Sequence, residues 1–278
     1  MIVRAYAKIN LTLDIIGKRE DGYHLIDSVF QSVGVFDVLH IKKSDAISVR
    51  CADIENENNI AFRAAKEFFW FTGIKGGADI KIEKNIPVCS GLGGGSADSA
   101  AVIYALDKIY GTSLSKDELT GIGLKCGADV PFFIYGGTAR ISGIGEEVAP
   151  LDFAEGFYAL LLKAGEKQST ADMYSRLDGV PAQRGLTNDF LEAAAKRGYK
   201  EALKYVSNAF MSVSEGKSAY NALKSQNPIA VSLSGSGPAY FALFENADAA
   251  KKAEKALNGQ GVFPLIVPFV SRGLEIIE

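Results

Sequence analysis

The stretch Pro87-Val-Cys-Ser-Gly-Leu-Gly-Gly-Gly-Ser-Ala97 concentrates glycine and serine between two regular segments. Residues 78–83 before it alternate apolar and polar side chains, which predicts a strand, and residues 96–110 after it predict a helix. At such a junction, successive backbone N–H groups can converge on an anion, and the helix N-terminus adds a favourable dipole. The stretch therefore predicts a phosphate-binding loop, with a flexible surface loop as the alternative.

Two other phosphate-binding signatures do not fit the chain. A loop of the GxxxxGK[ST] type would need a glycine where Met211 stands, because the chain's Gly-Lys-Ser is Gly216-Lys217-Ser218. A dinucleotide fingerprint GxGxxG that begins at Gly91 meets Ser96 where its last glycine belongs. These patterns disfavour an NTPase of the first type and a dehydrogenase.

Three further segments carry polar groups in unusual surroundings. Lys8 and Asn10 lie in an apolar, strand-like run, where a desolvated ammonium is costly unless it has a role or its head reaches water. Asp129 stands between small and apolar residues at the end of an expected helix, as a functional carboxylate or a turn cap. The segment Ser232-Leu-Ser-Gly-Ser-Gly-Pro-Ala239 is a hairpin turn or a second oxygen-binding loop.

The pattern along the chain predicts α+β organisation with two domains, 1–153 and 154–278. Asn58 or Asn59 can cap a helix, Ser115-x-x-Glu118 is a capping box, and the pattern weakens into a loop over 148–156. Strands are expected at 2–7, 11–16, 29–35, 38–41, 47–50, 78–83, 138–144, 157–163, 229–233, 239–244 and 262–270, and helices at 60–71, 96–110, 115–126, 171–177, 190–197, 201–210, 217–224 and 247–257.

Composition narrows the class of protein. The chain has 278 residues, of which 47% are hydrophobic and 23% charged, so it can bury a core and is not predicted to be disordered. Its formal charge of −3 disfavours nucleic acid as a partner. Three widely spaced cysteines form neither a disulfide framework nor a zinc site, and no apolar stretch reaches the ~18 residues of a membrane helix. We expect a cytoplasmic protein with a small-molecule substrate and no membrane partner.

Taken in order, the four polar segments resemble the motifs of the GHMP family of small-molecule kinases across nearly the whole chain. The resemblance implies a two-domain fold, with an N-terminal domain like domain 2 of ribosomal protein S5, a C-terminal ferredoxin-like α/β sandwich, and an active site in the cleft between them. It also implies ATP as phosphoryl donor, Mg²⁺ as cofactor, and a monomer or homodimer. The segment Arg19-Glu-Asp-Gly-Tyr-His-Leu25 is typical of members whose acceptor alcohol carries a cytidine diphosphate group.

The resemblance also implies roles for single residues. Asp129 matches the catalytic base that accepts the proton of the acceptor hydroxyl, and Lys8 matches its cationic partner. Asn10 would orient the acceptor, and Gly235 in the second loop would also bind the substrate. The expected ATP-binding residues are Asn59, Lys84, Pro87, Gly91, Leu92, Gly93, Gly94, Gly95 and Ser96. No side-chain metal ligand is assigned, since Mg²⁺ usually keeps several waters.

The same resemblance places the cytosine ring among aromatic side chains. Tyr23 and His24 match one wall and polar edge of that site, and Tyr174 aligns with its second aromatic wall. The alternative for Tyr23 and His24 is a capped turn with a half-buried tyrosine. The chain departs from its relatives at Cys89-Ser90, where small residues are common, and we expect that a thiol at Cys89 makes activity sensitive to thiol reagents.

Overall fold

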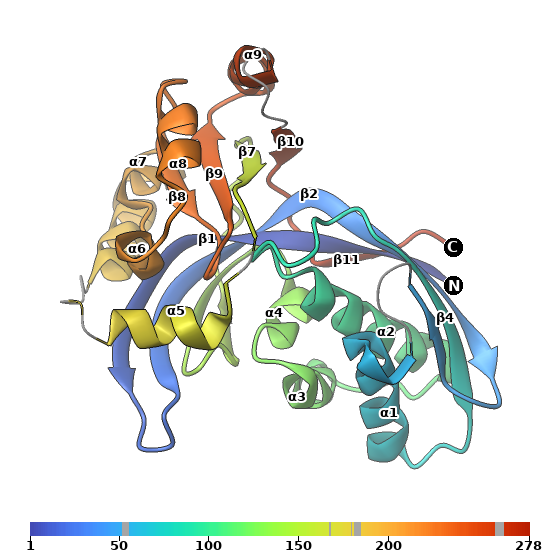
Figure 1. Cartoon of the computed structure of the whole chain (residues 1–278). Coiled ribbons are helices and arrows are strands. Elements are labelled where there is room, and N and C mark those ends of the chain that lie inside the picture. Colours follow the sequence, from blue (N-terminus) through green and yellow to red (C-terminus); the bar gives the residue numbers. More distant parts are fainter. Residues whose placement is uncertain (52–55, 167, 179, 181–184, 259–263) are drawn as a thin grey trace.

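The first of two sheets contains a long β-hairpin that crosses the molecule (Figure 1). The computed structural model describes residues 1–51, 56–166, 168–178, 180, 185–258 and 264–278. The strand order of the first sheet is β11-β1-β2-β4-β3, with β5 paired to β2 and β6 to β5. Its strands are β1 (Ile2–Lys18), β2 (His24–Ser44), β3 (Ser48–Arg50), β4 (Gly77–Glu83), β5 (Thr138–Ser142), β6 (Glu147–Pro150) and β11 (Leu274–Ile276).

The second sheet is antiparallel, with the order β10-β7-β9-β8, and lies on the other side of the long hairpin from the helices α1 to α4 (Figure 1). Its strands are β7 (Tyr158–Lys163), β8 (Ala230–Leu233), β9 (Ala239–Phe244) and β10 (Leu265–Pro268). The helices that accompany the first sheet are α1 (Ile60–Thr72), α2 (Gly94–Tyr110), α3 (Lys116–Cys126) and α4 (Val130–Tyr135). Those of the second half are α5 (Thr170–Leu177), α6 (Leu186–Arg197), α7 (Tyr199–Ala202), α8 (Lys217–Lys224) and α9 (Ala247–Asn258), with 3₁₀ turns η1 (Asn56–Asn58), η2 (Leu203–Tyr205) and η3 (Ala209–Ser212).

Irregularities in the β1–β2 pairing decide which way the strand side chains face. The register shifts between Tyr6 and Ala7 and again between Asn10 and Thr12. A shift in register turns the following side chains to the other face of a sheet. Residues 3, 5, 13 and 15 therefore join the core under the first group of helices, whereas residues 7, 9 and 11 join the core shared with the second sheet. The polar side chains between them, Lys8 and Asn10, face the helix side.

Most expected elements are present, and the differences have local causes. The strands expected at 2–7 and 11–16 are the single strand β1, and those at 29–35 and 38–41 are the single strand β2, because bulges bend the ladder without ending it. The prediction of one helix over 201–210 was wrong, because the segment contains the end of α7, then η2 and the start of η3. The loop expected over 148–156 overlaps β6, which covers Glu147–Pro150, and neither α4 nor β11 was predicted.

Capping chemistry predicted from the sequence is confirmed. The Asn59 side chain accepts a hydrogen bond from the backbone N of Ala61 at 2.9 Å and caps α1. Ser115 and Glu118 form a reciprocal capping box at the start of α3, which ends at Cys126.

Strand β10 covers 265–268, and residues 262 and 263 of the strand expected at 262–270 lie outside the described residues.

The division at 153/154 stays a prediction. Strand β11, close to the C-terminus, pairs with β1, so the last residues lie with the first sheet. Among the described helices, none combines the length and apolar character needed to cross a bilayer.

Candidate active site

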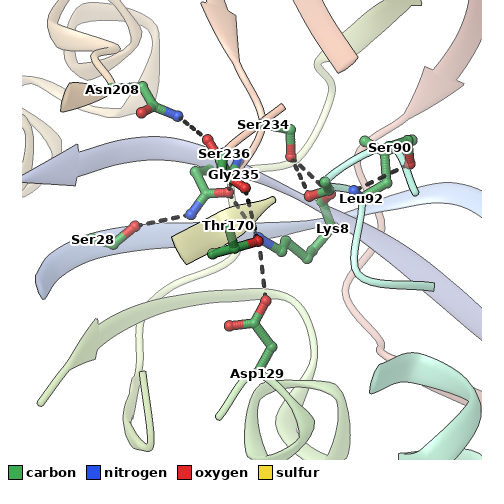
Figure 2. A network of polar contacts seen from close by, with 12 residues as sticks. Lys8, Ser28, Ser90, Leu92, Asp129, Thr170, Asn208, Ser234, Gly235 and Ser236 are labelled. Carbon is green, nitrogen blue, oxygen red and sulfur yellow. Dashed lines mark hydrogen bonds and ion pairs between the residues drawn. The ribbon is translucent and has the colours of Figure 1, made fainter. Parts of the chain in front are cut away.

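The strand β1 and the turn before α4 bring Lys8 and Asp129 together. Lys8 Nζ lies 3.4 Å from Asp129 Oδ2 (Figure 2). It also lies 2.8 Å from Asn10 Oδ1 and 4.3 Å from the centre of the Phe30 ring. The Lys8 side chain is 3% exposed, and that of Asp129 is 33% exposed. The ammonium is thus held inside the protein by oxygen atoms and an aromatic face, while the carboxylate remains open to a ligand.

Asn10 connects this ion pair to the second sheet. Its side chain is fully buried, its Oδ1 accepts a hydrogen bond from the Gly235 backbone N at 2.7 Å, and its Nδ2 donates to Ser28 Oγ at 3.3 Å. Gly235 belongs to the turn between β8 and β9. The orientation of the Asn10 amide is therefore fixed by groups from both halves of the molecule.

The glycine-rich loop ends in the N-terminus of α2, which begins at Gly94 with Gly93 as its cap in the left-handed region. The first N–H groups of a helix have no partner within it, so they are available to an anion. A Cβ on Gly93 would lie 2.6 Å from the Phe133 ring and 3.2 Å from Lys8 Cγ. This position needs glycine both for its backbone angle and because the loop passes close to Phe133 and Lys8.

The loop is attached to the β8–β9 turn. Ser234 Oγ donates to the carbonyl oxygen of Gly91 at 3.0 Å, and Ala239 N donates to that of Ser90 at 2.9 Å. A Cβ on Gly91 would lie 2.2 Å from the Ser234 carbonyl oxygen. Loop and turn therefore touch through their backbones.

A cavity of about 520 Å³ contains these groups. Sequence-predicted residues that line it are Lys8, Asn10, Asn59, Lys84, Pro87, Gly91, Gly93, Gly94, Gly95, Ser96, Asp129, Tyr174 and Gly235. Leu92, Tyr23 and His24 do not line it. Leu92 is buried, and its carbonyl oxygen accepts a hydrogen bond from Lys8 N at 2.9 Å.

Below the loop, one lysine is shared by two buried carboxyl groups. Lys84 Nζ lies 2.5 Å from Asp37 Oδ2 and 2.7 Å from Asp98 Oδ2. Asp37 Oδ1 also accepts the backbone N–H groups of residues 85 and 86. Asp98 Oδ1 has no hydrogen-bond partner within the described part of the chain, and burial raises the pKa of Asp98 to about 8 against the opposing attraction of Lys84. Asp98 thus holds its proton near neutral pH.

Aromatic residues close the other end of the cavity. The His24 ring is stacked on Tyr174, with ring centres 4.6 Å apart, and Tyr174 packs edge-on against Phe210. His24 Nε2 lies 2.7 Å from Asp178 Oδ1, and Lys18 Nζ lies 2.6 Å from Asp178 Oδ2. Burial and the charge of Asp129 raise the pKa of Tyr174 to about 12, so its phenol stays protonated. Tyr23 is 59% exposed.

Several residues of the site were not among those predicted from the sequence. The Thr170 and Ser236 hydroxyls, 3.2 Å apart, line the cavity (Figure 2). Ser28 and Asn208 also support the site from ordinary sequence surroundings. Signals were present at the Ser/Gly turn around Ser236, a candidate oxygen-binding loop, and at Asp98, which directly follows the glycine-rich stretch.

Comparisons with known proteins agree with this geometry. The family model "GHMP kinases N terminal domain" matches residues 59–137, and "GHMP kinases C terminal" matches residues 190–262. The 4-diphosphocytidyl-2-C-methyl-D-erythritol kinase of Clostridium acetobutylicum is 41% identical, covering 92% of this chain and 94% of the relative. The enzyme of that name from Carboxydothermus hydrogenoformans is 39% identical, covering 98% of each.

Solved structures extend the comparison. A crystal structure of 4-(cytidine 5'-diphospho)-2C-methyl-D-erythritol kinase is 32% identical with a TM-score of 0.78, covering 97% of this chain and 99% of that chain. The homoserine kinase from Cytophaga hutchinsonii has the same TM-score at 19% identity, covering 100% of this chain and 97% of that chain, and shows the fold alone. On the family models and the full-length relatives, the chain belongs to the GHMP kinases, in the family of 4-diphosphocytidyl-2-C-methyl-D-erythritol kinases.

Proposed function

We propose that this protein transfers the γ-phosphate of ATP to the 2-hydroxyl of 4-diphosphocytidyl-2-C-methyl-D-erythritol, a step of the non-mevalonate route to isoprenoid precursors. The observation that carries the proposal is one cavity that joins a glycine-rich loop to an open carboxylate paired with a buried ammonium. The substrate is that named for relatives at about 40% identity over nearly the full chain.

Asp129 acts as the general base. Its carboxylate is accessible from the cavity, so it can accept the proton of the hydroxyl as the oxygen attacks the γ-phosphorus. A positioned base of this kind contributes ~10²–10⁴-fold. The Lys8 ammonium, 3.4 Å away, stabilises negative charge that develops on the acceptor oxygen. Asn10 fixes the direction of the ammonium and lies where it can contact the acceptor.

The nucleotide is held by backbone groups. The glycines at 91 and 93–95 allow the backbone to approach the triphosphate, and the N-terminus of α2 points its N–H groups at it. Ser96 in the first turn offers a hydroxyl to a phosphate oxygen, and Asn59, Lys84 and Pro87 border the rest of the nucleotide.

The donor set of the cavity fits a magnesium ion carried by ATP. The described residues include no cluster of His, Cys, Asp and Glu that could hold a metal on its own. Mg²⁺ needs few protein ligands when phosphates and waters supply the others, and Ser96 Oγ is a hard oxygen donor in the cavity. When bound, the ion would neutralise charge on the phosphates.

We place the acceptor's cytosine ring beside Tyr174. Tyr174 lines the cavity there, His24 lies against its ring, and the exposed Tyr23 is available to cover the base on binding. Stacking of a base on an aromatic side chain is worth about 1–3 kcal/mol. This arrangement favours a cytidine-linked acceptor over a small alcohol such as mevalonate or homoserine.

The test is ATP consumption with Mg²⁺ and 4-diphosphocytidyl-2-C-methyl-D-erythritol, run beside mevalonate and homoserine. We expect turnover with the cytidine-linked substrate alone, and competition by CMP against that substrate but not against ATP. Turnover with another alcohol only would retain the kinase chemistry and refute the cytidine site. Silence with all three acceptors would favour a nucleotide-binding relative without catalysis.

A further inference from the structure

Asn208, at the start of η3, is a buried amide that uses its hydrogen-bonding groups on both sides. The residue is 6% exposed, and its Oδ1 accepts a hydrogen bond from Phe210 N at 2.9 Å. Its Nδ2 donates to the carbonyl oxygen of Leu233 at 2.7 Å and to that of Gly235 at 2.9 Å, the second of which is drawn in Figure 2. The acceptor caps its own segment, whereas the donors reach the β8–β9 turn.

The turn that Asn208 holds also delivers a donor to the catalytic strand. Gly235 N donates to Asn10 Oδ1 at 2.7 Å, and the same oxygen accepts from Lys8 Nζ at 2.8 Å. One oxygen atom therefore collects an ammonium from β1 and a backbone N–H from the second half of the chain. If the turn moves, Asn10 loses one of the two donors that fix its amide.

Asn208 is itself fixed to the strand that carries Lys8 and Asn10. The backbone of Ser207 exchanges hydrogen bonds with β1, donating to the Leu11 carbonyl oxygen at 3.1 Å and accepting from Leu13 N at 3.0 Å. Asn208 thus joins β1, immediately after Asn10, to the turn that contacts Asn10. This closes a ring of short contacts around the amide of Asn10.

We propose that Asn208 is a positioning residue for phosphoryl transfer, which acts through Gly235 to set the Asn10 and Lys8 side chains. The proposal rests on the proposed function, because Lys8 and Asn10 are the groups it positions. Without the Nδ2 donors, two turn carbonyls lose their partner and the turn relaxes, since a buried polar group without a partner is unfavourable. The Lys8 ammonium then loses a fixed acceptor, and a small misplacement of a catalytic group lowers the rate strongly.

The effect should appear in kcat for the transfer. The glycine-rich loop keeps its own attachment to the turn through Ser234 Oγ and Ala239 N. The KM for ATP should therefore change less than kcat. A purely structural role would instead lower the fraction of folded enzyme and leave kcat per active site unchanged.

Two substitutions separate the donors of Asn208 from its capping oxygen. Asn208→Asp keeps an oxygen for Phe210 N and removes both amide donors. Asn208→Ser also keeps a capping oxygen and replaces the two amide N–H groups by a single hydroxyl on a shorter side chain, without placing a charge in the interior. The control is Asn246→Ala, because Asn246 Oδ1 also accepts a backbone N–H, from Ala249 at 2.9 Å, at the start of α9 and away from the cavity. We expect kcat per active site to fall about tenfold or more in both Asn208 variants, and to stay within about twofold in the control.

A double-mutant cycle with Asn10→Ala gives the decisive readout. If Asn208 acts through Asn10, adding Asn208→Ser to Asn10→Ala should cost less than about twofold in kcat, compared with the tenfold in the wild-type background. Equal losses in the two backgrounds, or wild-type kcat in Asn208→Ser, would overturn the proposal. If Asn208→Asp does not fold, Asn208→Ser decides. Failure of the proposed function would differ, since the wild-type protein would then not turn over the cytidine-linked substrate.

Discussion

The titration of the buried Asp98 carboxyl makes the free energy of unfolding depend on pH. The substitution Asp98→Asn should remove this dependence. Asp98 is 3% exposed and competes with Asp37 for the single Lys84 ammonium. Burial raises the pKa of Asp98 to about 8, whereas the unfolded chain keeps a value near 3.8. Between these values, the folded protein holds a proton that the unfolded protein has released.

The sign and size of the effect follow from this difference in bound protons. The stabilisation is fully present below the unfolded pKa and is lost as pH rises through the folded pKa. One proton corresponds to about 1.4 kcal/mol per pH unit, or about 3 kcal/mol between pH 5 and pH 7. Because Asn does not titrate, the free energy of unfolding of Asp98→Asn relative to wild type should rise by about 3 kcal/mol over this range.

Urea unfolding followed by far-UV circular dichroism at pH 5, 6 and 7 measures this difference. The matched control is Asp107→Asn, which removes another buried carboxyl from α2. Burial acts to raise the pKa of Asp107, but hydrogen bonds led by that from Leu114 N outweigh it and leave the pKa below its ordinary value. The control should lower stability equally at all three pH values. Parallel pH curves for wild type and Asp98→Asn would refute the assigned charge state.

Three further outcomes are expected. Gly91→Ala should lower the free energy of unfolding in urea by about 2 kcal/mol or more and reduce kcat. The reason is that φ at this residue is +85° and a Cβ would lie 2.2 Å from the Ser234 carbonyl oxygen. Wild-type stability of this variant would contradict the close contact. Stoichiometric alkylation of Cys89, which is exposed and lines the cavity, should abolish ATP turnover and be slowed by ATP, and unchanged activity would remove this idea. Asp178→Ala should raise the KM for the cytidine-linked acceptor several-fold and leave the KM for ATP unchanged, because Asp178 holds His24 against Tyr174. Equal changes in both KM values would contradict that role.

The local chemistry of the sequence predicted the elements that depend on neighbours in the chain. The caps at Asn59 and Ser115 and the junction of β4, loop and α2 were readable because their signals lie within a few residues. The helix expected at 115–126 is α3, which ends at Cys126. The short helix α4 follows it with Pro131 in its first turn, where proline is tolerated.

Features set by pairing between distant segments were not readable. The bulges that turn Lys8 and Asn10 toward the helix side depend on β2, and β11 forms only because β1 offers an edge some 270 residues earlier. Asn208 looks like any capping residue until the turn near Gly235 is folded beside it. The family resemblance predicted that Lys8, Asp129 and the glycine-rich loop belong to one site. The residue patterns alone left a structural alternative for each: a lysine whose head reaches water, a turn cap, and a flexible surface loop. Tyr23 and His24 lie at the tip of the β1–β2 hairpin, outside the cavity lining.

The central claim is that the Lys8 and Asp129 pair transfers phosphate in this cavity, and the kcat of Asp129→Asn tests it most directly. The substitution preserves shape and removes the proton acceptor, so we predict a fall in kcat of at least ~10². Binding of ATP and of 4-diphosphocytidyl-2-C-methyl-D-erythritol, measured by calorimetry on the same protein, should remain close to wild type. A kcat near that of wild type would contradict the assignment of Asp129 as the base.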